Sequence, residues 1–232
     1  MANDRAVILA SGGLNSAVAA AIARESHDLA MLHVRIGHRA DEREFGLFQK
    51  QADHFGAAQR LVAAMPHFLQ MGGNARMDRK RQIEDALAIK EFESDCYVPG
   101  IIGALTSAAL TWARCIGATR VFLGISENLG PPGPPTFQVY PDYGREFVQV
   151  CQDAYELASP TARVTLETPL LDMSRAEIVS VGATLGVPFE LTWSCISSGS
   201  EPCGACLGCA TRNRGFVEAS IPDPTLLQPA GR

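Results

Sequence analysis

The stretch Ala6-Val7-Ile8-Leu9-Ala10-Ser11-Gly12-Gly13-Leu14-Asn15-Ser16 joins an apolar run to a turn that contains two glycines. A short, continuous apolar run is typical of a strand that is buried on both faces of a parallel sheet. The alanine-rich residues 17–23 are expected to form a helix, so the turn connects a strand to a helix. Glycines let backbone N–H groups approach an anion, and the N-terminus of the following helix adds its free N–H groups and positive dipole. The stretch therefore predicts a phosphate or pyrophosphate site, with Ser11 and Ser16 as hydroxyl donors.

This turn lacks two common nucleotide-binding patterns, G-x-x-x-x-G-K-S/T and G-x-G-x-x-G. An ordinary tight connection between a strand and a helix is the alternative to a phosphate site. Apolar strands and helices continue to alternate downstream, which predicts an α/β fold with a Rossmann-like parallel sheet covered on both faces. We expect this domain to span residues 1–190, with strands at 29–34, 59–63 and 121–124 and helices at 41–55, 100–116 and 175–185.

Two stretches interrupt the alternation. Residues 66–96 are polar, charged and irregular, which favours a mobile or partly helical insertion. The basic run Arg76–Arg81 within them is interpreted as a solvated face rather than a nucleic-acid site. Residues 129–135 hold four prolines and two glycines shortly after the strand at 121–124. Ligands of open α/β sheets bind at the carboxyl ends of strands, so this stretch is either a lid or substrate loop or a simple linker.

Four of the seven cysteines fall close together near the end of the chain. Cys203, Cys206 and Cys209 are spaced three apart, and Cys195 lies upstream of them. Four converging thiolates suit tetrahedral Zn²⁺ and leave no open position for a catalytic water. We therefore expect a structural zinc site in a C-terminal segment, residues 191–232. An iron–sulfur cluster or four unconnected thiols are the alternatives. The remaining cysteines are interpreted as core or incidental thiols: Cys96, Cys115 and Cys151.

Composition excludes several classes of protein. The hydrophobic fraction of 47% is ordinary for a globular protein, and the formal net charge of −5 argues against a broad nucleic-acid-binding face. No run approaches the roughly 18 apolar residues of a membrane span, so no membrane association is expected. The N-terminus does not read as a signal peptide, and clustered thiols favour a reducing compartment. We expect a cytoplasmic protein.

The turn at residues 11–16 resembles the PP-loop motif S-G-G-x-D/N-S. This motif belongs to the ATP pyrophosphatases, enzymes that cleave ATP to AMP and pyrophosphate. Other segments are similar to one family of that superfamily, the 7-cyano-7-deazaguanine synthases. The resemblance covers nearly the whole chain and is most specific in the C-terminal third. The matching segments are Val98-Pro99-Gly100, Tyr140-Pro141-Asp142, Thr168–Ile178, Leu191–Cys195, Pro202–Cys209, Arg212 and Gly215-Phe216.

The resemblance implies an ATP-dependent C–N ligase acting on a 7-carboxy-7-deazaguanine-type acid. ATP would adenylate the carboxylate, ammonia would displace AMP to give an amide, and a second adenylation would dehydrate the amide to a nitrile. Mg²⁺ would neutralise the pyrophosphate. The expected substrates are therefore ATP, the deazapurine acid and ammonia, and we expect the enzyme to be a homodimer.

The same resemblance assigns residues to these steps. The implied catalytic residues are Ser11, Asn15 and Ser16. ATP is expected to contact those three together with Gly12, Gly13, Leu14, His38, Arg39 and Gly124. The acid is expected near Glu127, Tyr140, Asp142, Tyr143, Arg145 and Trp193. Aromatic rings can stack on a purine, and a carboxylate can accept from its amino edge.

Several residues near this expected site depart from the family's pattern. Asn15 stands where the PP-loop has aspartate, which removes a carboxylate that could help hold Mg²⁺. Ile101-Ile102 stand where the family has Arg-Asn, and Tyr143-Gly144 where it has Cys-Arg. Three hypotheses stay open: a nitrile or amide synthase that uses ammonia, a ligase that joins the acid to a protein or other amine, and a nucleotide-binding relative without catalysis. Divergent relatives in bacterial antiphage systems are examples of the second.

Overall fold

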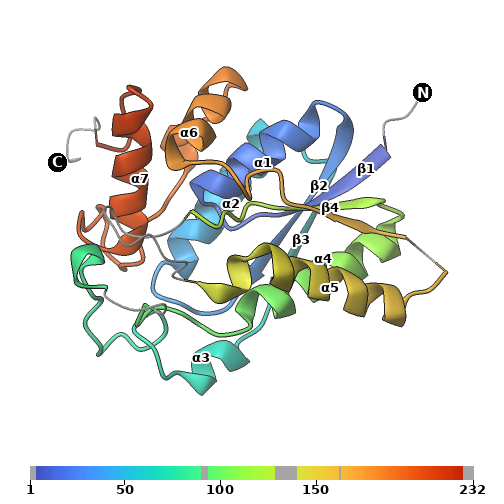
Figure 1. The fold of residues 1–232 in the computed structure, drawn as a ribbon, viewed down its shortest axis with the longest axis horizontal. Coiled ribbons are helices and arrows are strands. Elements are labelled where there is room, and N and C mark those ends of the chain that lie inside the picture. The colour runs from blue at the N-terminus through green and yellow to red at the C-terminus, as the bar shows by residue number, and fades with distance from the viewer. Residues whose placement is uncertain (1–3, 90–93, 129–139, 162, 227–232) are drawn as a thin grey trace.

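Five parallel strands form a single sheet at the centre of the molecule (Figure 1). The computed structural model describes residues 4–89, 94–128, 140–161 and 163–226. The strand order across the sheet is β3-β2-β1-β4-β5, and every neighbouring pair is parallel. The strands are β1 (Asp4–Leu9), β2 (His27–Arg35), β3 (Gln59–Ala64), β4 (Arg120–Leu123) and β5 (Thr165–Glu167).

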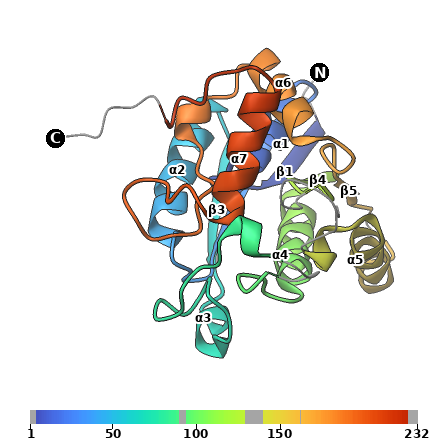
Figure 2. The same ribbon diagram turned by 60° about the vertical axis from the view of Figure 1, so that its left-hand side comes forward.

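Helices cover both faces of this sheet, as Figures 1 and 2 show. One face carries α1 (Leu14–Arg24), α2 (Asp41–His54), α6 (Arg175–Thr184) and α7 (Leu207–Glu218). The other carries α4 (Ile101–Ile116) and α5 (Arg145–Ala158). The remaining helices are short: α3 (His67–Met71) and the 3₁₀ turns η1 (Ala86–Ala88), η2 (Pro141–Tyr143) and η3 (Phe189–Leu191). In the described part of the chain, none of the helices is long and apolar enough to span a bilayer.

Strand β1 shows why residues 6–9 are all apolar. Ala6 and Ile8 pack with α1, α2 and α6 on one side, whereas Val7 packs with α4 on the other. Successive side chains of a strand point to opposite faces, so a strand covered on both sides needs a continuous apolar run. The predicted doubly covered parallel sheet is confirmed.

The chain reverses its direction of travel across the sheet at β1. The strands β2 and β3 lie on one side of β1, whereas β4 and β5 lie on the other. The carboxyl ends of β1 and β4 are neighbours, since Leu9 is in register with Leu123. Such a switch point is where open α/β sheets bind ligands, and residues 11–16 follow β1 directly at this place.

Three elements were not expected from the sequence: β5, α5 and α7. Helix α5 is amphipathic and lies on α4 through the half-buried Phe147 and Tyr155. In the described residues 66–89 and 94–96, the helical elements are short, in line with the irregular composition. Within them Met77 is buried and Arg76 turns toward the interior, so the solvated-face interpretation of Arg76–Arg81 is wrong at its first two positions. The proline stretch at 129–135 lies outside the described residues.

Candidate active site and metal centre

The loop between β1 and α1 is shaped by glycine and held by its two serines. Gly12 adopts φ +82°, and a Cβ there would lie 2.3 Å from the carbonyl oxygen of Glu44, so another residue would be strained and would collide. Ser16 Oγ donates to the Gly13 carbonyl oxygen at 3.1 Å, and Gly13 N–H donates to Ser11 Oγ at 3.1 Å. The first turn of α1 contains no acidic residue. These features fit an anion at the N-terminus of α1.

Gly124, directly after β4, completes this end of the sheet. A Cβ at Gly124 would lie 2.6 Å from the backbone nitrogen of Ser16. The end of β4 therefore passes against the start of α1 at a distance that only glycine permits. This explains why the predicted residues Gly124 and Ser16 meet although 108 positions separate them in the sequence, 124 minus 16.

A cavity opens beside the 11–16 loop, between the carboxyl ends of the strands and the start of α4. We call it the central cavity. Of the sequence-predicted residues, Ser11, Gly13, Ser16, His38, Gly124, Tyr143 and Trp193 line it. The other lining residues are Leu9, Ala10, His33, Val34, Ile36, Glu44, Arg76, Ile101, Ile102, Leu105, Leu123, Ile125 and Ser194.

Two histidines and a glutamate give the central cavity its polar wall. His38 Nε2 lies 3.0 Å from a carboxylate oxygen of Glu44, and both side chains are largely buried. Burial opposes ionisation of Glu44, but the charge and hydrogen bond of His38, together with the charge of Arg76, outweigh it and hold the pKa of Glu44 below its ordinary value. His33 Nδ1 lies 2.9 Å from the Ala10 carbonyl oxygen, and burial lowers the pKa of His33. His33 is therefore neutral, donates through Nδ1 and leaves Nε2 as an acceptor.

Asn15 points to the opposite side of the loop. Asn15 and Leu14 line a smaller cavity together with Arg175 of α6. Arg175 Nη1 donates to Asn15 Oδ1 at 3.2 Å, and burial lowers the pKa of Arg175 to about 10. An aspartate at residue 15 would pair with this cation, whereas the neutral asparagine leaves its charge uncompensated. The smaller cavity is thus electropositive and adjoins the anion-binding end of α1.

Arg39 does not line the central cavity. Its Nη2 donates to the Asp78 carbonyl oxygen at 2.6 Å and also contacts the Arg81 carbonyl oxygen. The guanidinium thereby fixes the 72–85 segment. The contact between Arg39 and nucleotide stays a prediction. The hydrogen bonds of the Arg39 guanidinium to the 78–81 backbone do not favour it.

The predicted substrate residues of η2 divide into two groups. Tyr143 lines the central cavity, and its ring lies 5.3 Å from that of Tyr140, which stacks in turn on Tyr97 at 5.5 Å. Asp142 is buried beneath the first turn of α4, where Oδ2 accepts from Ile102 N–H at 3.3 Å. Burial raises the pKa of Asp142. Tyr143 therefore faces the central cavity, whereas Tyr140 and Asp142 support it from behind.

Glu127 and Arg145 do not line the central cavity. They contact each other and Asp172 near the surface instead. Glu127 Oε1 accepts from Arg145 N–H at 2.6 Å, and Arg145 Nη2 pairs with Asp172 at 2.6 Å. The Arg145 and Asp172 side chains are 62% and 76% exposed. Their role in recognising substrate stays a prediction.

Trp193 links the 11–16 loop to the C-terminal segment. Its backbone N–H donates to the Gly12 carbonyl oxygen at 3.1 Å, and the buried Gln51 side chain donates to that oxygen and to the Leu191 carbonyl oxygen. The Arg43 guanidinium carbon lies 3.9 Å from the centre of the Trp193 ring. One ring face is thus occupied by a cation, which leaves less of the ring for the predicted stacking on a purine.

The four C-terminal cysteines converge on one point. Their sulfur atoms all lie within 4.8 Å of one another, with Cys203 and Cys209 at 3.9 Å and Cys195 and Cys206 at 4.0 Å. A tetrahedral Zn²⁺ with bonds of about 2.3 Å needs sulfurs about 3.8 Å apart. Backbone N–H groups of Ser197, Cys203 and Cys206 point at these sulfurs, which stabilises thiolates. The predicted metal ligands are brought together.

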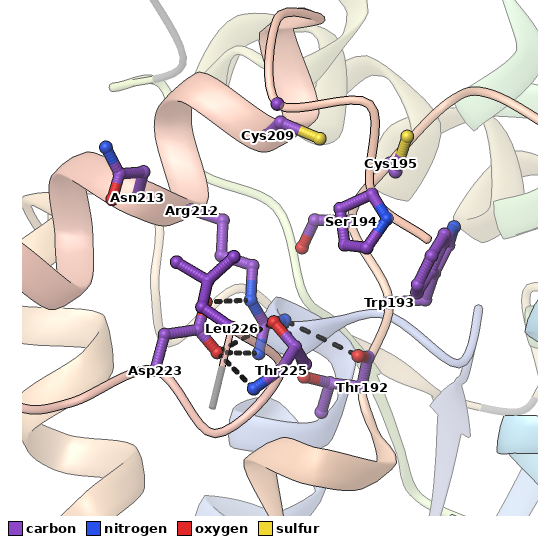
Figure 3. A pocket seen from close by; sticks show the side chains of 12 residues that line it. Thr192, Trp193, Ser194, Cys195, Cys209, Arg212, Asn213, Asp223, Thr225 and Leu226 are labelled. Atoms are coloured by element: carbon purple, nitrogen blue, oxygen red, sulfur yellow. Dashed lines mark hydrogen bonds and ion pairs between the residues drawn. The ribbon is translucent and has the colours of Figure 1, made fainter. Parts of the chain in front are cut away.

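A buried ion pair fastens the end of the chain beside this cluster (Figure 3). Arg212 of α7 donates to both carboxylate oxygens of Asp223, at 2.6 and 2.9 Å, and to Thr192 Oγ1 at 2.8 Å. Both charged side chains are more than nine-tenths buried. Phe216 of the same helix packs edge-on against Phe189 in the main core.

Sequence comparison relates the chain to a family of known enzymes. The family model described as Queuosine biosynthesis protein QueC matches residues 5–220. Curated relatives named 7-cyano-7-deazaguanine synthase include that of Chlorobium luteolum, 36% identical over 222 residues and 95% of each chain. That of Oceanobacillus iheyensis is 31% identical over 226 residues, 97% of this chain and 98% of the relative. The chain belongs to the QueC family.

Membership in the QueC family confirms the resemblance and makes the chain an enzyme. The structure also places the substitutions noted above. Ile101 and Ile102 lie in the first turn of α4 and line the central cavity, so an apolar wall stands where the family's Arg-Asn pair is expected.

Sequence reasoning missed Glu44, Arg76 and Arg175 as site residues. Each lies on a helix or segment remote in sequence from the 11–16 loop, and no local motif marks it. The one available signal for Arg175 was the capping box at Ser174 and Glu177, which fixes where α6 begins but not what its first residue contacts.

Proposed function

We propose that this QueC family member adenylates a 7-carboxy-7-deazaguanine-type acid with ATP and transfers the acyl group to ammonia. The phosphates of ATP lie at the 11–16 loop, held by N–H groups in the first turn of α1 and by the hydroxyls of Ser11 and Ser16. The acid lies in the central cavity beside Tyr143. What carries the proposal is that the cavity and the anion-binding helix N-terminus share Ser11, Gly13 and Ser16, within a chain of this family.

The chemistry balances in two steps. A carboxylate oxygen attacks the α-phosphorus, the bond between the α-phosphorus and its bridging oxygen breaks, and pyrophosphate leaves. Ammonia then attacks the acyl carbon, AMP leaves with its electron pair, and a proton is lost to give the amide. The residues of the central cavity act by holding the acid and ATP in line and by excluding water from the acyl adenylate. Mg²⁺ is expected to accompany ATP, and it would neutralise part of the charge on the phosphates.

The amide is the proposed main product. Dehydration to the nitrile requires a second adenylation, now of a neutral amide oxygen. Ile101 and Ile102 line the cavity and offer that step no polar group, and Asn15 removes an acid from the loop. We expect the first adenylation to proceed and the second to be weak or absent.

We propose Zn²⁺ as the metal of the cysteine cluster. Four sulfurs at tetrahedral spacing saturate the ion, so the site is structural and takes no part in the reaction. We also propose that the enzyme is a homodimer, which light scattering on the purified protein would measure directly.

The test is incubation of the enzyme with 7-carboxy-7-deazaguanine, ATP, Mg²⁺ and ammonium, followed by mass spectrometry and a pyrophosphate assay. We expect AMP, pyrophosphate and amide in equal amounts. The double variant Ser16→Ala/Gly13→Val should lose ATP binding, because a Cβ at Gly13 approaches Ser11 Oγ to 2.9 Å. Ser26→Ala/Gly46→Val is the matched control, since Ser26 is exposed and Gly46 has open space around its Cβ position.

The outcomes separate the open hypotheses. Efficient nitrile formation would show that the substitutions in the cavity are tolerated. Release of AMP only when a protein amine is supplied would identify a ligase with another acceptor. ATP binding without any AMP release would contradict catalysis altogether.

A further inference from the structure

The central cavity contains one permanent cation. Among the described residues that line it, Arg76 is the only lysine or arginine, and Glu44 is the only acid. His33 is held neutral by burial, because its pKa is lowered. The positive charge available to a ligand in this cavity therefore comes chiefly from Arg76.

The backbone at Arg76 is fixed on both sides. Its carbonyl oxygen accepts from Arg39 N–H at 3.2 Å, and its neighbours Ala75 and Met77 are both buried. Met77 N–H is held by Asn74 Oδ1 at 3.1 Å. The segment thus presents the Arg76 side chain to the cavity from a rigid position, which lowers the entropic cost of binding an anion.

The guanidinium of Arg76 feels the charge of Glu44 but has a donor that nothing in the described part of the chain accepts from. Its Nε is buried and has no hydrogen-bond partner in the described part of the chain. The carboxylate of Glu44 is already engaged by His38. Burial disfavours the charge of Arg76, but Glu44, Tyr143 and Tyr140 outweigh this and raise its pKa, so the side chain stays charged. A buried cation with an unsatisfied N–H donor is costly, and an anionic ligand that accepts from this donor would remove that cost.

The neighbours of Arg76 identify which anion. The phosphates have their own donors in the 11–16 loop, whereas Arg76 lies within electrostatic reach of Tyr140 and Tyr143, on the side of η2. Ile101 and Ile102 make the adjoining wall apolar. Of the anionic groups on the proposed substrates, the carboxylate of the acid is the one without donors in the 11–16 loop, and an arginine fork matches a carboxylate with two parallel hydrogen bonds.

We propose that Arg76 binds the carboxylate of the acid substrate in a bidentate pair and thereby selects the acid over its neutral amide, an inference that rests on the proposed function. Ile101 and Ile102 give their part of the cavity wall no charge, and Arg76 supplies the positive charge from another part of the same wall. It holds the carboxylate until adenylation removes the charge, after which the neutral product is bound less tightly.

The test measures binding of 7-carboxy-7-deazaguanine, its 7-carboxamide and ATP by titration calorimetry. The wild-type enzyme should bind the acid more tightly than the amide. Arg76→Met should weaken binding of the acid by about 10- to 100-fold and change the affinities for the amide and ATP by less than about twofold. Arg76→Lys should recover part of the loss, since it keeps the charge but not the fork. Arg79→Met, at an exposed position of the same segment, is the control.

Equal affinity of the wild-type enzyme for acid and amide would overturn the inference without any variant, so a folding defect in Arg76→Met cannot hide the answer. Unchanged acid binding in Arg76→Met would also overturn it. Equal losses for acid and ATP would make Arg76 a phosphate ligand instead. If wild-type protein binds ATP but not the acid, the proposed function fails as well, whereas failure of the Arg76 variants alone leaves that function standing.

Discussion

Single atoms decide the geometry of the phosphate-binding turn. The carbonyl group of Glu44, in α2, occupies the space that a side chain at residue 12 would need. The backbone of α2 thereby supports the loop from behind, while the Glu44 side chain reaches His38 at the cavity wall. One residue of α2 thus shapes both the anion site and the polar wall beside it.

Gly12→Ala should weaken ATP binding at least about tenfold, because the new Cβ meets the Glu44 carbonyl oxygen and the left-handed backbone disfavours alanine. Gly46→Ala, in α2 with open space around its Cβ position, should leave ATP binding unchanged. Calorimetric titration with ATP measures both. Equal affinity in the Gly12 variant would place the phosphates elsewhere.

His33 makes the fold sensitive to mild acid. Its pKa is lowered in the folded protein by burial, so the unfolded chain takes up the proton first as the pH falls below about 6.5. Stability from this residue is therefore complete above that pH and is lost below it, by at most about 1.4 kcal/mol per pH unit.

Urea unfolding at pH 7.5 and pH 5.5 tests this prediction. His33→Gln should reduce the loss of stability between the two pH values, whereas His67→Gln, at an exposed position, should not. An identical loss in the wild-type protein and in His33→Gln would mean that other groups carry the acid sensitivity.

At the scale of elements, α7 is attached to the rest of the molecule by three kinds of contact. Phe216 enters the main core, Arg212 forms the buried pair with Asp223, and Cys206 and Cys209 join the metal cluster at the start of the helix. These residues are spaced three or four apart and therefore lie along one face of α7. We expect the loss of any one contact to loosen α7 without unfolding the sheet.

Asp223→Asn should destabilise the protein by about 3 to 5 kcal/mol, because it leaves Arg212 as a buried charge without its partner. Asp53→Asn removes an exposed ion pair with Arg60 and should cost less than about 1 kcal/mol. Chemical denaturation of the two variants gives the comparison. Similar costs at the two positions would show that the Arg212–Asp223 pair adds nothing beyond a surface contact.

The cysteine cluster should hold one equivalent of zinc. Cys206→Ser should lose the metal and expose residues 191–226 to limited proteolysis, since metal binding is linked to folding of this segment. Cys115→Ser, which removes an exposed thiol far from the cluster, should retain both zinc and protection. Elemental analysis together with a protease time course decides the matter. Iron with sulfide in place of zinc would contradict the assignment.

At the scale of the whole molecule, the sequence predicts what neighbouring residues encode. The β1–α1 turn, the apolar strands and the C-x-x-C spacing are local patterns, and each is confirmed in the structure. Helix α5 carries a helical repeat of apolar residues at Phe147, Val148 and Tyr155, so the signal for it was present in the sequence and was overlooked. Arg76 joins Glu44 and His38 in one cavity only once the chain has folded, so no spacing in the sequence predicts that cavity.

The carbonyl oxygen of Gly12 accepts from both Trp193 and Gln51, and Gln51 also binds Leu191. The 11–16 loop and residues 191–194, which lead to Cys195, are therefore joined by one set of hydrogen bonds. Thermodynamic coupling between two sites is reciprocal. If metal loss relaxes Trp193 and so weakens ATP binding, then saturation with ATP must raise the affinity of the cluster for zinc by the same factor, which a competition titration with a chelator would measure. Metal occupancy would then change the affinity for ATP, although the metal does not contact the nucleotide.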